Sequence, residues 1–248
     1  LGENRGYGRL IELVKEQKPS VLLFGYGAIE AFGGAARLDS FIQQYEKIIS
    51  DCKSVSAEGV RVILLAPMEL VAMPAPLPSP ESANANIKLY QAGIRDLAGK
   101  LGATYVTLSM PAAKDPADLL KITDNGQHLR ADGYARSARQ LVDQLTPGKE
   151  KELKTGDSES FRQLIQKKNE LFFHRYRPQN VTYLFLFRKH EQGNNAVDIP
   201  KFDPLVGELE QQISSILSGL YSLGGHRDRA LIEYRVTPDT IFKSISYE

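Results

Sequence analysis

The stretch Val21-Leu22-Leu23-Phe24-Gly25-Tyr26-Gly27 is a continuous apolar run that ends in two glycines. A second run, Val60-Arg61-Val62-Ile63-Leu64-Leu65-Ala66, is ended by Pro67, and a third is Thr104-Tyr105-Val106-Thr107-Leu108. Short apolar runs rich in Val, Ile and Leu are typical of strands that are buried on both faces of a parallel sheet. These three runs therefore predict the strands of one buried sheet.

The segments between the strands have apolar residues at helical spacing. The clearest sets are Leu38, Phe41, Ile42, Tyr45, Ile48 and Ile49; Ile87, Tyr90, Ile94, Leu97, Ala98 and Leu101; and Ala138, Leu141, Val142 and Leu145. Alternating strands and helices predict βαβ units, a parallel sheet and helices on both of its faces. In such sheets ligands bind at the carboxyl ends of the strands, here residues 25–30, residues 67–69 and the segment after Leu108.

Residues 67–82 hold five of the 13 prolines and show no clear periodicity. This pattern predicts a long loop, and long loops inside a compact domain are usually functional.

The overall composition is that of a globular protein. The chain has 248 residues, of which 42% are hydrophobic and 25% charged, and a net charge of +1. This charge balance argues against nucleic acid and anionic membranes as partners, and no apolar run is long enough for a membrane span. Cys52 is the single cysteine, so no disulfide can form within the chain. No group has metal-ligand spacing, and Gly25-x-Gly27 lacks the third glycine of a dinucleotide fingerprint, so we expect no cofactor.

The pattern changes after Pro147. We predict an α/β domain over residues 1–148 and a smaller α+β extension, helix-strand-helix, over residues 149–220. The strand of the extension is predicted at Val181–Phe187, a run of β-prone residues. Residues 221–248 have weak patterns and are predicted as a tail.

A basic and polar cluster flanks this predicted strand: His174, Arg175, Arg177, His190 and Glu191. One interpretation is an anion or substrate contact on the extension. The other, which we favour, is a solvated surface beside a packed strand.

The segment Asp124-Asn125-Gly126-Gln127-His128-Leu129 is the strongest chemical signal, and a helix follows it. A histidine on a glycine-containing turn is held by the backbone while its ring stays accessible, as a general base requires. A nearby carboxylate, Asp124, can orient the imidazole. The alternative is an ordinary turn that is capped by Asp124 or Asn125, with His128 incidental.

Two blocks resemble the SGNH/GDSL hydrolases. The segment Thr123–Leu129 with Gly133-Tyr134 resembles the last block of that family, and Val21–Phe32 resembles the block with its Gly-x-Asn-Asp/Glu motif. Together they cover residues 7–146. Residues 167–205 also look like an extension that follows such domains in planctomycete-type bacterial proteins.

The resemblance implies a three-layer α/β/α, flavodoxin-like parallel sheet and ester hydrolysis through a serine acyl-enzyme. It also implies that His128 is the general base. Gly25, Gly27, Glu30 and Asn125 fall in the substrate and oxyanion region, and the family resemblance suggests export to the periplasm or secretion.

The chain departs from the family pattern at three places. No Gly-Asp-Ser precedes Val21, so we expect the first strand and its nucleophile to be absent. Gly156-Asp157-Ser158 spells the motif but lacks a preceding strand, and we interpret Ser158 as a helix-cap residue. Ile29 stands at the position of the oxyanion asparagine, where loss of a donor costs roughly 10²–10³ in rate.

The third departure is Asn125, three residues before His128, where the family has Asp. Either Asp124 supplies the carboxylate from a shifted turn or a backbone carbonyl orients the ring.

The sequence therefore leaves two functional hypotheses open. The first is a carboxylic-ester hydrolase that acts on a small-molecule ester, such as an acylated carbohydrate, and that is inactive in residues 1–248 because the serine is absent. The second is a non-catalytic binding or interaction domain on the same fold, which Ile29 favours.

Overall fold

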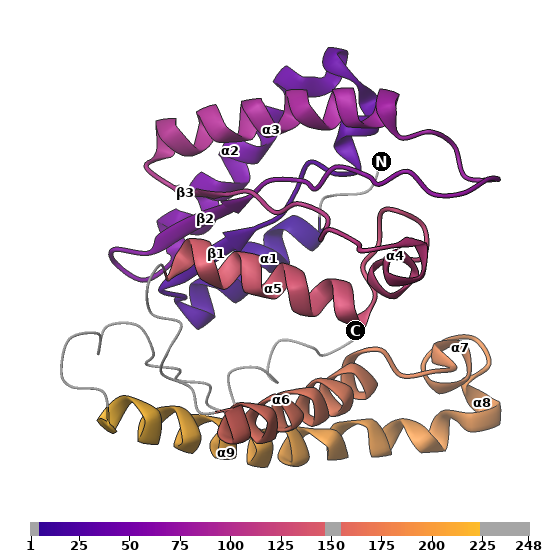
Figure 1. The fold of residues 1–248 in the computed structure, drawn as a ribbon. Coiled ribbons are helices and arrows are strands. Elements are labelled where there is room, and N and C mark those ends of the chain that lie inside the picture. The colour runs from indigo at the N-terminus through magenta and orange to yellow at the C-terminus, as the bar shows by residue number, and fades with distance from the viewer. Residues whose placement is uncertain (1–4, 147–154, 224–248) are drawn as a thin grey trace. The chain divides into compact units, whose positions relative to one another are not determined.

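The structure is a computed structural model that describes residues 5–146 and 155–223. The chain divides into two compact units, Leu1–Lys151 and Glu152–Glu248. Figure 1 shows the first unit as helices around a small sheet and the second as a set of helices. Among the described residues, no helix combines the length and the apolar character that a membrane span requires.

The sheet of the first unit has three parallel strands in the order β1-β2-β3. They are β1 (Val21–Phe24), β2 (Arg61–Leu65) and β3 (Thr104–Val106). Each lies inside one of the three apolar runs, which supply the side chains that the sheet buries. The predicted α/β class with a parallel sheet is confirmed.

Helices connect and cover these strands. In chain order they are α1 (Arg5–Gln17), η1 (Glu30–Gly33), η2 (Ala35–Arg37), α2 (Leu38–Val55), α3 (Glu81–Leu101), α4 (Pro116–Ile122) and α5 (Ala131–Leu145). Figure 1 shows α3 and α5 on opposite sides of the sheet, which is the arrangement that a parallel sheet requires.

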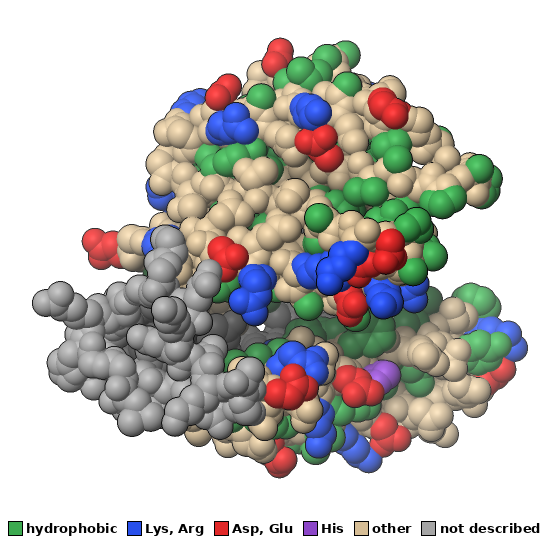
Figure 2. Space-filling model, in the orientation of Figure 1, with side chains coloured by type: hydrophobic (Ala, Val, Ile, Leu, Met, Phe, Trp, Pro, Cys, Tyr) green, Lys and Arg blue, Asp and Glu red, His purple; other side chains and the backbone are tan. Residues whose placement is uncertain are grey.

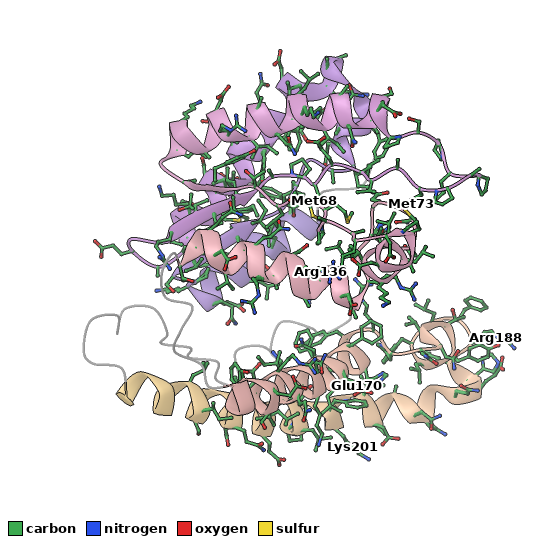
Figure 3. All side chains as sticks on the ribbon, viewed as in Figure 1. Met68, Met73, Arg136, Glu170, Arg188 and Lys201 are labelled. Atoms are coloured by element: carbon green, nitrogen blue, oxygen red, sulfur yellow. The ribbon has the colours of Figure 1, made fainter. Side chains whose placement is uncertain are left out.

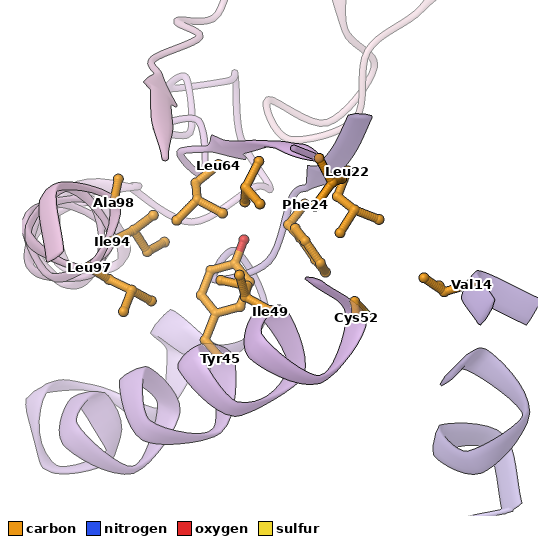
Figure 4. Close-up of a cluster of buried hydrophobic side chains, with 12 residues drawn as sticks. Val14, Leu22, Phe24, Tyr45, Ile49, Cys52, Leu64, Ile94, Leu97 and Ala98 are labelled. Atoms are coloured by element: carbon orange, nitrogen blue, oxygen red, sulfur yellow. The ribbon is translucent and has the colours of Figure 1, made fainter. Parts of the chain in front are cut away.

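The main core lies between the sheet and the helices α1, α2 and α3. Figure 4 shows its side chains, including Leu22 and Phe24 of β1, Tyr45 of α2 and Ile94 of α3. The rings of Phe24 and Tyr45 meet edge to face, with centroids 6.2 Å apart. Successive residues of a strand point to opposite faces, so Leu23 points away from this core, and it is 49% exposed.

The second unit is built on two long helices, α6 (Thr155–Tyr176) and α9 (Phe202–Leu223), which pack against each other. Two cross-helix ion pairs join them: Arg175 with Asp203, and Lys168 with Glu210 at 2.9 Å. Arg175 therefore has a structural partner, while His174 stacks near the ring of Phe202 with centroids 6.0 Å apart.

The prediction of a strand at Val181–Phe187 is wrong. Residues Val181–Leu184 form a short helix, α7, and Leu184 and Phe185 donate backbone hydrogen bonds to the carbonyls of Asn180 and Val181. A strand needs a neighbour to satisfy its backbone, and the described residues of this unit offer none. Local helical hydrogen bonds therefore override the β-propensity of the side chains. The described part of this extension is helical, not α+β.

The rest of the second unit consists of α8 (Lys189–Gln192) and η3 (Gly193–Lys201). Ser158 lies four residues into α6, rather than at its cap, and no strand leads into it among the described residues. Residues 224–248, most of the predicted tail, lie outside the described residues.

Candidate functional site

The turn that carries His128 is held together by Thr123. Its hydroxyl donates to the carbonyl of His128 at 2.7 Å and accepts the backbone N–H of Gly126 at 3.0 Å. Thr123 and Leu129 also form an isolated antiparallel bridge. Thr123 is fully buried while His128 is exposed. The backbone is therefore fixed, and the imidazole is accessible to solvent.

Asn125 makes the contact to the imidazole ring. Its Oδ1 accepts the backbone N–H groups of Gln127 at 3.0 Å and of His128 at 2.8 Å. Its Nδ2 lies 2.9 Å from Nδ1 of His128. One side chain thus caps the turn and orients the ring. The side chain of Asp124 is exposed and makes no hydrogen bond or ion pair with any described residue.

Gly126 lets the loop after β2 approach this turn. Its φ of +77° suits glycine, and a Cβ built there would lie 2.2 Å from the carbonyl oxygen of Val71. Val71 donates its N–H to the carbonyl of Gly126 at 2.9 Å. Figure 3 labels Met68 and Met73 in this loop. The start of the proline-rich loop therefore forms a wall beside the turn of His128.

Asn84, near the start of α3, also binds this loop. Its side chain accepts the N–H of Leu70 at 2.7 Å and donates to the carbonyl of Leu70 at 2.9 Å. Gln91 donates to the carbonyl of Pro67 at 2.8 Å. Both ends of the 67–71 segment are thus bound to α3, which makes it a firm support.

The end of β1 forms a second part of the site. The backbone N–H of Gly27 donates to the carboxylate of Glu30 at 2.9 Å. Gly27 has a φ of +112°, and a Cβ there would lie 3.0 Å from Ile94 and 3.5 Å from Pro67. The carboxylate of Glu30 is therefore used to accept a backbone N–H of its own turn. Gly25 is exposed, with only Leu65 near the position of a Cβ.

Ile29 follows in the same turn, and its side chain is 69% exposed. It stands where the family resemblance calls for an amide donor, and its side chain cannot donate a hydrogen bond.

The structure links these parts through the 67–71 segment. Pro67 lies beside Gly27, and Val71 lies beside Gly126. Among the described residues, no hydrogen bond joins His128 to Glu30 or to a serine hydroxyl.

A pocket of about 710 Å³ borders the end of β1. Its wall includes Ile29 and Glu30 of the turn, Tyr26, and residues of α1, α2 and α3 such as Tyr7 and Tyr45. His128 does not line it. The sequence analysis missed this pocket, because its aromatic residues have the helical spacing of ordinary core residues.

Tyr45 lines this pocket, and its buried hydroxyl has no hydrogen-bond partner among the described residues. Burial raises the pKa of Tyr45 to about 12. The backbone of Tyr26 acts in the opposite direction and lowers the pKa of Tyr45, but the effect of burial is larger.

An ion pair supports the helix that follows His128. Arg136 of α5 donates to both carboxylate oxygens of Asp118 in α4, at 2.7 and 3.1 Å, and to the carbonyl of Ala112. The hydrogen bonds from Arg136 lower the pKa of Asp118 to about 2. Figure 3 shows Arg136 on α5. This pair fixes α4 against α5 and so frames the turn between them.

The charged side chains of the described residues are not gathered into a group suited to a metal ion. On the face drawn in Figure 2, acidic and basic side chains of the first unit lie intermixed. Within residues 5–146 and 155–223, no three His, Cys, Asp or Glu residues are grouped so that they could hold a metal ion.

Comparison with known proteins gives two family matches. The model of the sugar-transfer associated ATP-grasp family matches residues 191–248, of which 224–248 lie outside the described residues. No significant match was found among curated proteins or solved structures. The model of the GDSL-like lipase/acylhydrolase family matches residues 3–136, more than half of the chain, and includes β1, β2, β3 and the turn of His128. The chain therefore belongs to the GDSL-like lipase/acylhydrolase family.

Proposed function

We propose that the protein hydrolyses a small-molecule carboxylic ester, such as an acylated carbohydrate, and that His128 is the group that exchanges the proton. The observation that carries this proposal is the combination at one turn of a fixed backbone and an accessible ring. Thr123 and Asn125 bind the backbone of the turn, and Asn125 orients the imidazole. A general acid or base needs this combination of fixed position and access.

The site surfaces suit an ester with an apolar part. The side chain of Met73 lies beside Gly126 in the turn of His128, and it offers an apolar surface to an acyl chain or a leaving group. Asn125 orients the ring, and Asp124, whose side chain makes no hydrogen bond or ion pair with a described residue, contributes little. A serine acyl-enzyme is the family's route, and residues 1–248 should turn over poorly because no described serine reaches His128.

Hydrolysis of p-nitrophenyl acetate tests the proposal. The assay uses protein produced from the whole coding sequence, with His128→Ala as the variant and His190→Ala, an exposed histidine of the second unit, as the matched control. We expect His128→Ala to lose at least about 10²-fold in kcat/KM and His190→Ala to match the wild type. Equal rates in all three proteins would exclude His128 as the group that exchanges the proton.

A binding domain on the same fold is the second candidate. Exposed Ile29 at the oxyanion position favours it, since a site without that donor stabilises an oxyanion poorly. Fluorophosphonates discriminate between the two candidates, because they label an activated serine. For residues 1–248 we expect no labelling, and stoichiometric labelling of any serine would contradict our account of the nucleophile.

A further inference from the structure

The hydrogen bonds of Asn125 determine which of its two side-chain atoms faces His128. Backbone N–H groups can only donate, and those of Gln127 and His128 both point at one atom of the Asn125 amide. That atom must be the oxygen, since the amide nitrogen has no lone pair to accept with. The two backbone donors therefore fix the orientation of the amide.

The atom that faces the ring must then be Nδ2, which lies 2.9 Å from Nδ1 of His128. An amide nitrogen donates, so Nδ1 has to accept and carries no hydrogen. In a neutral imidazole one nitrogen carries the proton and the other accepts. The proton of neutral His128 is therefore on Nε2.

We infer that Asn125 is a positioning residue that holds neutral His128 in the Nε2–H tautomer, so that the site presents a hydrogen-bond donor to an oxygen of its ligand. An aspartate at this position would do the reverse. Both carboxylate oxygens accept, so Nδ1 would carry the proton and Nε2 would keep the lone pair that takes a proton from a hydroxyl. The tautomer follows from contacts within the turn, whereas its consequence for hydrolysis rests on the proposed function.

The consequence is a change of role for the ring. In the resting state, Nε2 of His128 can donate to a carbonyl or carboxylate oxygen but cannot accept the proton of a serine or a water there. In this tautomer His128 donates to the ester. It takes up the proton-exchanging role of the proposed function only after the contact with Asn125 is lost or the proton moves from Nε2 to Nδ1. The sequence left Asp124 and a backbone carbonyl as candidate partners of the ring, and both would have placed the proton on Nδ1.

Asn125→Asp is the decisive variant. The replacement is nearly isosteric, and a carboxylate oxygen can still accept the backbone N–H groups of Gln127 and His128, so the turn is expected to persist. Asp124→Asn is the matched control, because it removes a neighbouring carboxylate that makes no hydrogen bond or ion pair with a described residue. Asn125→Ala removes the side chain altogether and leaves the ring to distribute between both tautomers.

The measurement is a long-range proton–nitrogen NMR correlation of ring-labelled protein at pH 8.5, above the ordinary titration range of imidazole. We expect a single Nε2–H tautomer at His128 in the wild type and in Asp124→Asn, and Nδ1–H in Asn125→Asp. A wild-type ring protonated on Nδ1, or an Asn125→Asp spectrum equal to that of the wild type, would overturn the inference. Thermal unfolding of each variant establishes that it is folded.

Ester hydrolysis by the same variants separates this inference from the proposed function. If the protein is an esterase, Asn125→Asp should raise kcat by up to roughly 10⁴-fold. A serine hydrolase loses about this factor when its catalytic histidine is held in the wrong tautomer. A switched tautomer with no hydrolysis in either protein supports the inference and counts against the proposed function. A switched tautomer with a lower kcat contradicts the claim that Asn125 keeps Nε2 of His128 from accepting a proton.

Discussion

Val71 and Gly126 are joined by a backbone hydrogen bond of 2.9 Å between the N–H of Val71 and the carbonyl of Gly126. Fifty-five residues separate them in the sequence. This contact ties the loop after β2 to the turn that carries His128, and Asn84 of α3 binds the same loop through Leu70. The position of His128 therefore depends on the loop as well as on its own turn.

Replacing Gly126 should test that dependence. The Cβ in Gly126→Ala would lie 2.2 Å from the carbonyl oxygen of Val71, and the loop or the turn would have to move. We expect a loss of about 2–5 kcal/mol in the free energy of unfolding, measured by urea denaturation.

Gly59→Ala is the control for this substitution. Gly59 has a similar positive φ of +71°, and nothing lies within 4 Å of its Cβ position, so the loss should be only about 1 kcal/mol. Equal losses in the two variants would show that close approach at Val71 does not matter.

Removing the hydroxyl of Tyr45 should stabilise the protein. Tyr45 is 2% exposed, and its Oη has no hydrogen-bond partner in the part of the chain that the structure describes, so folding desolvates a polar group without compensation. We expect Tyr45→Phe to raise the free energy of unfolding by about 1 kcal/mol.

Tyr90 provides the contrast, because its buried hydroxyl donates to the carbonyl of Gly34 at 3.2 Å. Tyr90→Phe should lower the free energy of unfolding by about 1 kcal/mol. Destabilisation by both substitutions would show that the hydroxyl of Tyr45 has a partner after all.

The ion pair of Asp118 and Arg136 should make stability depend on pH in an acidic window. The pKa of Asp118 is lowered from 3.8 to about 2 in the folded protein, chiefly by the hydrogen bond from Arg136. A lowered carboxyl pKa contributes stability that is present above pH 3.8 and is lost as the pH falls through 2. The difference in Tm between the wild type and Asp118→Asn should therefore be positive at pH 5, shrink between pH 4 and 2, and vanish below 2. A difference that stays constant down to pH 2 would contradict this account.

The strands of the sheet could be predicted from the sequence, because a short apolar run between Pro and Gly residues, such as Val21–Phe24, fits few structures other than a buried strand. The sequence could not predict the fate of Val181–Phe187, because a β-prone run becomes a strand only where a partner strand lies beside it. That depends on the whole unit rather than on the run.

Only the local part of the site could be predicted from the sequence. The glycine turn with His128 is a local pattern, and the sequence revealed it. Whether Asp124, Asn125 or a carbonyl contacts the ring depends on the direction of the side chains. The position of Asp124, one residue before the family's Asp, does not determine that direction. Asp118 and Arg136 lie 18 residues apart on two helices. The charge pattern of the sequence contains many such pairs and does not show which of them form.

The claim that His128 belongs to an ester site is tested most directly by a ligand that binds without reacting. The probe is 4-nitroacetanilide, the amide analogue of p-nitrophenyl acetate, which is titrated while the ring signals of His128 and His190 are followed by NMR. We predict a saturable shift of the His128 signals with no change at His190, and a weaker shift when Met73, whose side chain lies beside Gly126 of the turn, is replaced by Ala. Signals of His128 that stay unchanged up to the solubility limit of the probe, or that move in step with those of His190, would contradict the account.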